Sequence, residues 1–423
     1  MSDKKNVPKI RFPGFTEPWE QRKLEDIYGS IGNAFVGTAT PYYVESGHFY
    51  LESNNIKDGQ INHNTEVFIN DEFYEKQKDK WLHTGDMVMV QSGHVGHAAV
   101  IPEELNNSAA HALIMFRNPK KEIEPYFLNY QYQTLKSKKK IENITTGNTI
   151  KHILASEMQQ FEVDMPELAE QKKIAEYFRA LDHLITLHQR KLEHVKKMKK
   201  SMLQKMFPKK NQLYPEVRFP GFTDAWEQRK LGELVKEGIL EAPLDGNHGE
   251  KHPTSDEYVD SGIPFLMASD IHNGEVNIYS CKYITKERAE RLDKGFARNG
   301  DVLLTHKATI GETAILSNLM TEYAMLTPQV TYYRIKNEER LNREYLYSFF
   351  NSLDFQTELK TKAAQSTRPY IGITAQQNLK IILPAEIDEQ IRIGLYFRNL
   401  DHLITLHQRE SIFAFILKNI THL

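Results

Sequence analysis

The sequence is nearly free of cysteine and has no long apolar run, and each absence excludes a class of protein. Its 423 residues include a single cysteine, Cys281, so intrachain disulfides cannot hold the fold together. No stretch reaches the roughly 18 to 20 apolar residues that a membrane-spanning helix needs. The charged first residues are not followed by the apolar segment of a signal peptide. We therefore expect a globular protein of the cytoplasm.

The motifs of common active sites are also missing. The stretch that begins at Gly32 has the glycine spacing of a phosphate-binding loop, but Thr38 and Ala39 stand where Lys and Ser or Thr are required. No G-x-G-x-x-G, H-E-x-x-H, zinc-type Cys/His cluster or G-x-S-x-G occurs. His94 and His97 are expected to lie in a strand and turn rather than to bind a metal. The sequence therefore predicts no catalytic residue, no metal ligand and no cofactor held by this chain.

What the chain does contain is a long internal repeat. The opening segment "RFPGFTEPWEQRKL" at residues 11–24 returns as "RFPGFTDAWEQRKL" at 218–231, and "YFRALDHLITLHQR" at 177–190 returns as "YFRNLDHLITLHQR" at 396–409. Between these segments the two halves differ strongly but keep weak echoes in the same order, such as "TGDMVMVQSGHVGHAAVI" and "NGDVLLTHKATIGETAIL". Such self-similarity predicts a duplicated architecture of about 210 residues per copy. Trp19 and Trp226 are expected to pack at the start of each domain.

The variable stretches predict mixed domains of strands and helices. Short apolar runs such as "DMVMVQ", "HAAVI", "DVLLT", "TAIL" and "QVTYYRI" are separated by Gly, Asn and Asp, which is typical of strands and turns. By contrast, no Gly or Pro occurs between Pro166 and Pro208. The sequence therefore predicts two α/β (α+β) globular domains, the first followed by one long helix over roughly 167–206, and the same order in the second copy.

Both predicted helices carry a heptad seam. Apolar positions at alternating steps of four and three indicate a helix that pairs with another helix. The first copy has Ile174, Phe178, Leu181, Ile185, His188, Leu192, Val195, Lys199, Met202 and Met206; the second begins with Phe397, Leu400, Ile404 and His407. We favour antiparallel pairing within the chain over the alternative that each helix only packs on its own domain. The two seam histidines are expected to set the helix register.

The second helix departs from the first after Arg409. There the sequence reads "ESIFAFILKNITHL" instead of "KLEHVKKMKKSMLQKMF", so the seam positions become Ser411, Ala414, Lys418 and Thr421. The seam is expected to break. Either the apolar run from Ile412 to Leu417 shifts the helix register, or the end of the helix is altered, and both would affect partner docking there.

A formal net charge of −2 gives no overall attraction to nucleic acid, so a nucleic-acid partner would need local basic patches. Each variable stretch contains one basic loop near its end. Basic side chains suit phosphates, and Arg, Gln, Ser and Thr suit base edges, although a solvated helix end is the alternative. The candidate DNA-binding residues are Lys136, Lys138, Lys139, Lys140, Thr149 and Lys151 in the first copy and Lys360, Lys362, Gln365, Ser366, Thr367, Arg368 and Tyr370 in the second.

With these features in view, the chain resembles the specificity subunit of a type I restriction-modification system. The resemblance covers almost the whole chain and rests on the repeated opening segments and on the pattern Glu170, Gln171, Ile174, Phe178, Leu181, Asp182 and Ile185, which matches Glu389, Gln390, Ile393, Phe397, Leu400, Asp401 and Ile404. It implies a non-catalytic subunit with two target recognition domains, each reading half of a bipartite, asymmetric site on double-stranded DNA. Paired helices would set the spacing and dock two methyltransferase subunits, directing adenine methylation, and restriction/translocase subunits could join for cleavage.

The resemblance also implies where domains begin and which groups partners bring. The expected ranges are 1–166 for the first target recognition domain, 167–207 for the first spacer helix, 208–216 for a linker, 217–384 for the second domain and 385–423 for the second helix. The seam residues Ile174, Phe178, Leu181, Ile185, Leu192, Val195, Phe397, Leu400 and Ile404 would pair the helices and dock partners. S-adenosylmethionine, and ATP and Mg for restriction, are expected on partner subunits. Two other classes stay open: a non-catalytic coiled-coil protein adaptor, and a stand-alone DNA-modifying enzyme.

Overall fold

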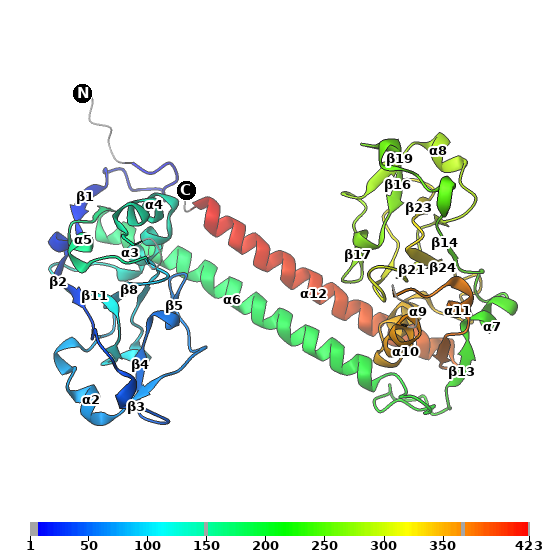
Figure 1. Cartoon of the computed structure of the whole chain (residues 1–423), viewed down its shortest axis with the longest axis horizontal. Coiled ribbons are helices and arrows are strands. Elements are labelled where there is room, and N and C mark those ends of the chain that lie inside the picture. Colours follow the sequence, from blue (N-terminus) through cyan, green and yellow to red (C-terminus); the bar gives the residue numbers. More distant parts are fainter. Residues whose placement is uncertain (1–6, 148–150, 365–368, 422–423) are drawn as a thin grey trace. The chain divides into compact units, whose positions relative to one another are not determined.

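The computed structural model describes residues 7–147, 151–364 and 369–421. The chain divides into two compact units, unit 1 with residues 1–188 and 410–423 and unit 2 with residues 189–409. Each unit contains one globular domain, a piece of the long helix α6 (Leu168–Lys205) and a piece of the long helix α12 (Ile387–Thr421) (Figure 1). Within the described residues, no helix is long and apolar enough to cross a membrane.

The globular domain of unit 1 is built from two four-stranded sheets and short helices, whose labelled elements can be followed in Figure 1. The strand orders are β2-β11-β8-β9 and β10-β4-β7-β3, with two-stranded ladders β1-β12 and β5-β6. The strands are β1 (Glu20–Lys23), β2 (Tyr28–Asn33), β3 (Tyr43–Val44), β4 (His48–Leu51), β5 (Ile56–Lys57), β6 (Gln60–Ile61), β7 (Phe68–Ile69), β8 (Met87–Val90), β9 (Ala98–Val100), β10 (Ala109–Ala110), β11 (Leu113–Pro119) and β12 (Glu162–Met165). The helices are α1 (Leu24–Ile27), α2 (Asp71–Glu75), α3 (Pro125–Gln133), α4 (Leu135–Ile144) and α5 (Ala155–Gln159).

The globular domain of unit 2 repeats this plan. Its main sheet has the order β14-β24-β21-β22, and a five-stranded sheet has the order β15-β19-β16-β23-β20, with ladders β13-β25 and β17-β18. The strands are β13 (Glu227–Lys230), β14 (Leu244–Asp245), β15 (Tyr258–Val259), β16 (Ile263–Leu266), β17 (Ile271–His272), β18 (Glu275–Val276), β19 (Lys282–Ile284), β20 (Phe296–Ala297), β21 (Val302–Thr305), β22 (Thr313–Ile315), β23 (Ala324–Leu326), β24 (Val330–Tyr333) and β25 (Lys380–Leu383). The helices are α7 (Leu231–Lys236), α8 (Lys286–Glu290), α9 (Arg343–Phe350), α10 (Leu353–Ala363) and α11 (Ile373–Gln377).

Strand β8 shows why the central strands are apolar throughout. Successive side chains of a strand point to opposite faces of the sheet. Met87 and Met89 pack into one core with helix α3, while Val88 and Val90 pack into a second core with Leu51 of β4. Because both faces of the sheet are covered, every residue of this strand is buried. The apolar runs predicted as strands are confirmed as β8, β9, β21, β22 and β24.

The opening segments close each domain at its base. Strand β1, from the first "WEQRKL", pairs antiparallel with β12, the last strand before α6. Strand β13, from the second, pairs in the same way with β25, the last strand before α12. Trp226 is almost fully buried, and the Trp19 ring lies 5.6 Å from that of Phe127. The predicted packing of both tryptophans is therefore confirmed.

A buried ion pair ties each opening segment to its long helix. Arg11 donates to both carboxylate oxygens of Glu170, through Nε at 2.7 Å and Nη2 at 2.8 Å, and Arg218 makes the same bonds at the same distances to Glu389. The glutamates are essentially buried, with side chains 0% and 1% exposed. The hydrogen bond to Glu389 raises the pKa of Arg218, so the pair stays ionised.

The residue after each of these glutamates, Gln171 or Gln390, accepts a hydrogen bond from the backbone N–H at the start of α3 or α9. These contacts explain the repeated Glu-Gln pair.

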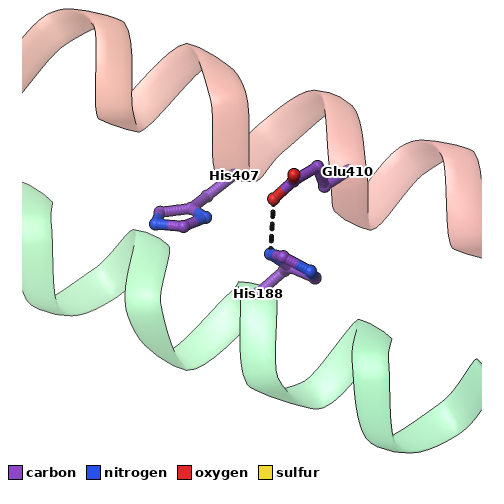
Figure 2. Close-up of side chains that lie close together, drawn as sticks. All are labelled: His188, His407 and Glu410. Carbon is purple, nitrogen blue, oxygen red and sulfur yellow. Dashed lines mark ion pairs between the residues drawn. The ribbon is translucent and has the colours of Figure 1, made fainter. Parts of the chain in front are cut away.

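The long helices pair antiparallel within each unit. In unit 1, Asp182 binds Lys418 with Nζ to Oδ1 at 2.7 Å, and His188 Nδ1 lies 2.8 Å from Glu410 Oε2 (Figure 2). Residues later in α6 therefore contact residues earlier in α12, which is the order of an antiparallel pair. In unit 2, Lys199 binds Asp401. The favoured pairing is confirmed, with one addition: at its start, α6 also packs on its own domain, where the Phe178 ring lies 5.1 Å from that of Tyr130.

The seam residues are mostly covered. Phe178, Leu181, Val195, Phe397 and Leu400 are buried. Ile174, Ile185, Leu192 and Ile404 are half-buried.

The end of α12 corrects one expectation. Its apolar residues do not shift the helix register, because Ala414 is buried. The Lys418–Asp182 pair is also equivalent to the Lys199–Asp401 pair, since the two aspartates are 219 residues apart and so are the two lysines. The side chains of Ile412, Phe413, Phe415, Ile416 and Ile420 are instead exposed. Side chains point outward all round a helix, so α6 can cover only those on the face of α12 that is turned toward it. The seam therefore continues to Lys418.

Candidate nucleic-acid interface

A loop follows the central strand of each main sheet and takes the same path in both units. In unit 1 it reads "QSGHVGH" (residues 91–97) after β8, and in unit 2 "HKATIGE" (306–312) after β21. Gly93 and Gly96 have φ of 81° and 87°, and Ala308 and Gly311 have φ of 68° and 95° at the matching positions. Positive φ is uncommon for alanine, so its presence indicates that the backbone path is retained although the side chains differ. We call these segments the post-strand loops.

The glycine at the later position of each post-strand loop, Gly96 in unit 1 and Gly311 in unit 2, is required by close packing. A Cβ on Gly96 would lie 2.8 Å from Ile141 Cγ2 of α4, and one on Gly311 would lie 2.3 Å from Gln356 Oε1 of α10. The Gln356 side chain also donates to the Gly311 carbonyl at 2.8 Å. Each post-strand loop is thereby fixed against the helix that carries the first lysines of the predicted basic segment, α4 in unit 1 and α10 in unit 2.

The predicted basic loops lie beside the post-strand loops. In unit 1, Gly93 N–H donates to the Lys151 carbonyl and Ile153 N–H to the Gln91 carbonyl, both at 3.0 Å. In unit 2, Lys307 forms an isolated bridge with Tyr370, and Ile371 N–H donates to the His306 carbonyl at 3.2 Å. Segments about 60 residues apart in the sequence thus form one surface in each domain.

In unit 1 these segments line a polar cavity of about 410 Å³. Lys138 and Lys151 contribute positive charge there, and Asp58 and Glu142 contribute negative charge, with Glu142 paired to Lys151 at 3.5 Å. Burial lowers the pKa of His97. Backbone N–H groups, lysines and histidines in one concave site can bind an anion such as a phosphate.

A family model described as "Type I restriction modification DNA specificity domain" matches residues 16–197 and 223–412 of the chain, one match per repeat. The chain belongs to this specificity family. It is thus the DNA sequence-recognition subunit of a type I restriction-modification system, as the resemblance implied.

The specificity subunit also has relatives and a structural neighbour across most of its length. It is 23% identical to the MjaVIII specificity subunit of Methanocaldococcus jannaschii, over 96% of this chain and 91% of that one. It is 24% identical to the EcoBI specificity subunit of Escherichia coli, over 59% of this chain and 53% of that one. A solved type I S subunit from M. genitalium covers 98% of both chains at 13% identity with a TM-score of 0.63. The neighbour shares the fold, with its two repeated domains.

The structure places the lysines predicted on α4 on different faces of that helix, and Lys151 lies beyond its end. Lys138 and Lys151 line the polar cavity, whereas Lys136 pairs with Asp164 and Lys140 donates to the Glu162 carbonyl at 3.1 Å, both beside β12. Residues two apart in a helix point about 200° apart, and residues four apart share a face, so one run of lysines cannot serve one surface. Lys139 is exposed and does not line the polar cavity. Thr149 lies outside the described residues.

The predictions in unit 2 are distributed in a similar way. Tyr370 is 39% exposed beside the post-strand loop, and Lys307 Nζ lies 6.0 Å from the centre of its ring. Lys360 is exposed on α10, whereas Lys362 pairs with Glu358 at 2.7 Å. The predicted residues Gln365, Ser366, Thr367 and Arg368 lie outside the described residues.

Sequence reasoning missed Lys307 and a buried polar cluster below Tyr370. Asp245 accepts from Lys294 and lies 2.9 Å from His248 Nε2, and His306 is fully buried with Nδ1 2.9 Å from the Ile371 carbonyl. A Cβ on Gly246 would lie 1.8 Å from the Leu326 carbonyl oxygen, which accounts for the glycine. The cluster joins residues about 60 positions apart without a motif, so the sequence contained no signal for it.

The buried His306 predicts a fall in stability at mildly acidic pH. Because Nδ1 donates to Ile371, a second proton would enter at Nε2, which is buried without a hydrogen-bond partner among the described residues and 3.9 Å from Asp245 Oδ2. Burial lowers the pKa of His306 below its ordinary value near 6.5. The unfolded chain therefore takes up the proton first as pH falls. Stability is full above about pH 6.5 and decreases below it, by at most about 1.4 kcal/mol per pH unit.

Thermal unfolding midpoints at pH 7.5, 6.5 and 5.5 check this expectation. His306→Asn, which keeps a donor for Ile371, should reduce the drop between pH 6.5 and 5.5. His248→Asn is the matched control, because His248 is exposed and should leave most of the drop in place. An equal drop in the wild type and in His306→Asn would show that another group controls it.

Proposed function

We propose that each globular domain reads one half of a bipartite, asymmetric DNA sequence with its post-strand loop and basic loop. The observation that carries this proposal is one backbone arrangement occurring twice with unlike side chains: Ser92 and His94 in unit 1 stand where Lys307 and Thr309 stand in unit 2. Lysines and backbone N–H groups suit phosphates, while the differing polar side chains suit different base edges. Because the two domains carry different side chains on duplicated scaffolds, they would recognise different half-sites, and the whole DNA site would be asymmetric.

The long helices would set the spacing between the half-sites and dock two methyltransferase subunits. Supporting this part, residues on the helices are exposed at equivalent positions of both repeats. Leu184 and Leu403 are 42% and 37% exposed, and His183 and His402 beside them are also exposed. Exposed apolar residues that recur on equivalent surfaces suit two copies of one partner. Restriction/translocase subunits would join that assembly in the cytoplasm.

In this proposal the chain itself performs no chemistry. S-adenosylmethionine would bind the methyltransferase subunits, and ATP and Mg would bind the restriction subunits. The chain would direct adenine methylation or cleavage by placing these partners on DNA.

The proposal predicts a specific change in the salt dependence of DNA binding. Each phosphate contact contributes about 0.9 to the slope of log affinity against log salt concentration. In the complex with methyltransferase subunits, Lys138→Ala with Lys151→Ala should lower that slope by about 1.8. Lys136→Ala with Lys139→Ala removes the same charge from neighbouring positions outside the polar cavity and should leave the slope nearly unchanged. Affinities measured by fluorescence anisotropy between 50 and 200 mM salt provide the test.

Two results would contradict the proposal. Equal slopes for the two double variants would remove the polar cavity from the DNA interface. Methyl transfer to DNA by the purified chain alone, given S-adenosylmethionine, would show that the chain is an enzyme in its own right.

A further inference from the structure

Unit 1 contains a second cavity that the proposed DNA interface does not use. It has a volume of about 450 Å³ and lies between residues 8–19 and helices α3, α4 and α6. Its lining is largely apolar and aromatic, and includes Ile10, Trp19, Phe127, Tyr177 and Phe178. A volume of this size lies in the range of sites that bind small ligands or peptide side chains. We call it the base cavity.

In unit 2, the matching position is filled by the two residues that follow α6. Phe207 is 4% exposed, and its ring centre lies 6.3 Å from that of Trp226, 5.8 Å from Tyr345 and 5.7 Å from Phe397. In the repeat, these three aromatic residues correspond to Trp19, Phe127 and Phe178 of the base cavity. Met206 beside it is also 4% exposed. The lining of the base cavity thus has a known occupant within this chain, namely a helix end with the sequence Met-Phe.

The backbone near this occupant is bonded to the opening segment of unit 2. Val217 N–H donates to the Lys205 carbonyl at 2.9 Å, which satisfies one of the free carbonyls at the end of α6. The residue in the position of Val217 in unit 1 is Ile10, whose side chain is 60% exposed and whose N–H has no acceptor among the described residues. Arg11, which also lines the base cavity, has a buried Nη1 without a partner in the described part of the chain. The Ile10 N–H therefore lies where a helix C-terminus would supply a carbonyl acceptor, and Arg11 Nη1 is a second donor in the lining of the base cavity.

The charge beside the two positions is reversed. In unit 2, Glu216 lies 3.4 Å from both Lys205 and Lys209, one residue before and two residues after the Met-Phe pair. In unit 1 the corresponding residue is Lys9, which is exposed and has no ion pair within the described residues. An occupant of the base cavity would therefore favour acidic residues at the positions of Lys205 and Lys209.

From these observations we propose that the base cavity is a docking site for another polypeptide, specifically for a helix C-terminus that ends in Met-Phe and carries acidic residues next to that pair. The Met and Phe side chains fill the aromatic lining as Met206 and Phe207 do in unit 2. The last carbonyls of the helix accept from Ile10 N–H and Arg11 Nη1. Lys9 selects acidic over basic helix ends.

Three fluorescein-labelled peptides test this site on the full-length chain at 150 mM salt. The first has the sequence of residues 195–209, the second carries Lys205→Glu and Lys209→Glu, and the third adds Met206→Ala and Phe207→Ala to the second. Anisotropy should show the second peptide binding about 5-fold more tightly than the first, since an exposed ion pair contributes little. The third should bind at least about 20-fold more weakly than the second, because it loses the buried Met and Phe side chains.

Chain variants locate the binding. Ile10→Asp should weaken binding of the second peptide, whereas Val36→Asp, at an exposed valine of the same unit outside the cavity, should not. Lys9→Glu should invert the preference, so that the natural sequence binds more tightly than the acidic one. Equal binding of the second and third peptides would overturn the proposal. The proposal would also be overturned if neither Ile10→Asp nor Lys9→Glu changed the affinity for the peptides. The absence of binding at millimolar peptide concentration would overturn it as well.

Discussion

Replacing Arg218 by alanine is expected to lower the free energy of unfolding of unit 2 by about 3 to 5 kcal/mol. The substitution leaves the Glu389 carboxylate, whose side chain is 1% exposed, without its two hydrogen bonds from the guanidinium. An unpaired buried charge costs far more than the pair contributes, which is why removing one partner has so large an effect. Arg11→Ala should act in the same way on unit 1 through Glu170, which keeps the Trp19 Nε1 donor at 3.2 Å.

Denaturant unfolding measures this loss, and amide hydrogen exchange of β13 and β25 localises it. Arg298→Ala is the control, because its ion pair with Glu322 joins two exposed side chains at 3.7 Å and should contribute at most about 1 kcal/mol. If Arg218→Ala and Arg298→Ala destabilise the protein equally, the buried pair is not what holds the opening segment to the helix.

The second large effect concerns which DNA sequence is read. Residues 232–379 lie between the opening segment of unit 2 and strand β25, and Leu231 N–H donates to the Leu379 carbonyl at 3.0 Å. The two ends of this variable segment are therefore adjacent, and β13 pairs with β25 just outside them. Replacing 232–379 with the corresponding segment of a relative of different specificity should preserve the scaffold. It should change one half of the recognised sequence completely and leave the other half and the spacing unchanged.

The repeated segments allowed much of the fold to be predicted. Antiparallel helices, seam burial and packing of Trp19 and Trp226 all follow from patterns that local periodicity and duplication reveal. The Arg–Glu ion pairs could not be predicted, because Arg218 and Glu389 are 171 residues apart and no sequence pattern links the two positions. For the end of α12 the sequence left two alternatives open, a register shift or an altered helix end, since an apolar composition does not by itself say which side chains face the neighbouring helix.

The candidate site was predicted only in part. Positive charge located the basic loop, yet it could not separate Lys138 from Lys136, which point to opposite sides of α4. The post-strand loop lacks a recognisable motif, because its shape is set by positive φ at Ala308 as well as at glycine. Its proximity to Tyr370 is a tertiary contact that sequence spacing does not encode.

Sequencing of methylated bases tests most directly whether each domain reads one half-site. A host would carry the partner subunits with either the wild-type chain or the chain exchanged at residues 232–379. Our account predicts that the two sets of methylated sites share one half and the spacer length and differ in the other half. A change in both halves, or identical sites for the two chains, would contradict it.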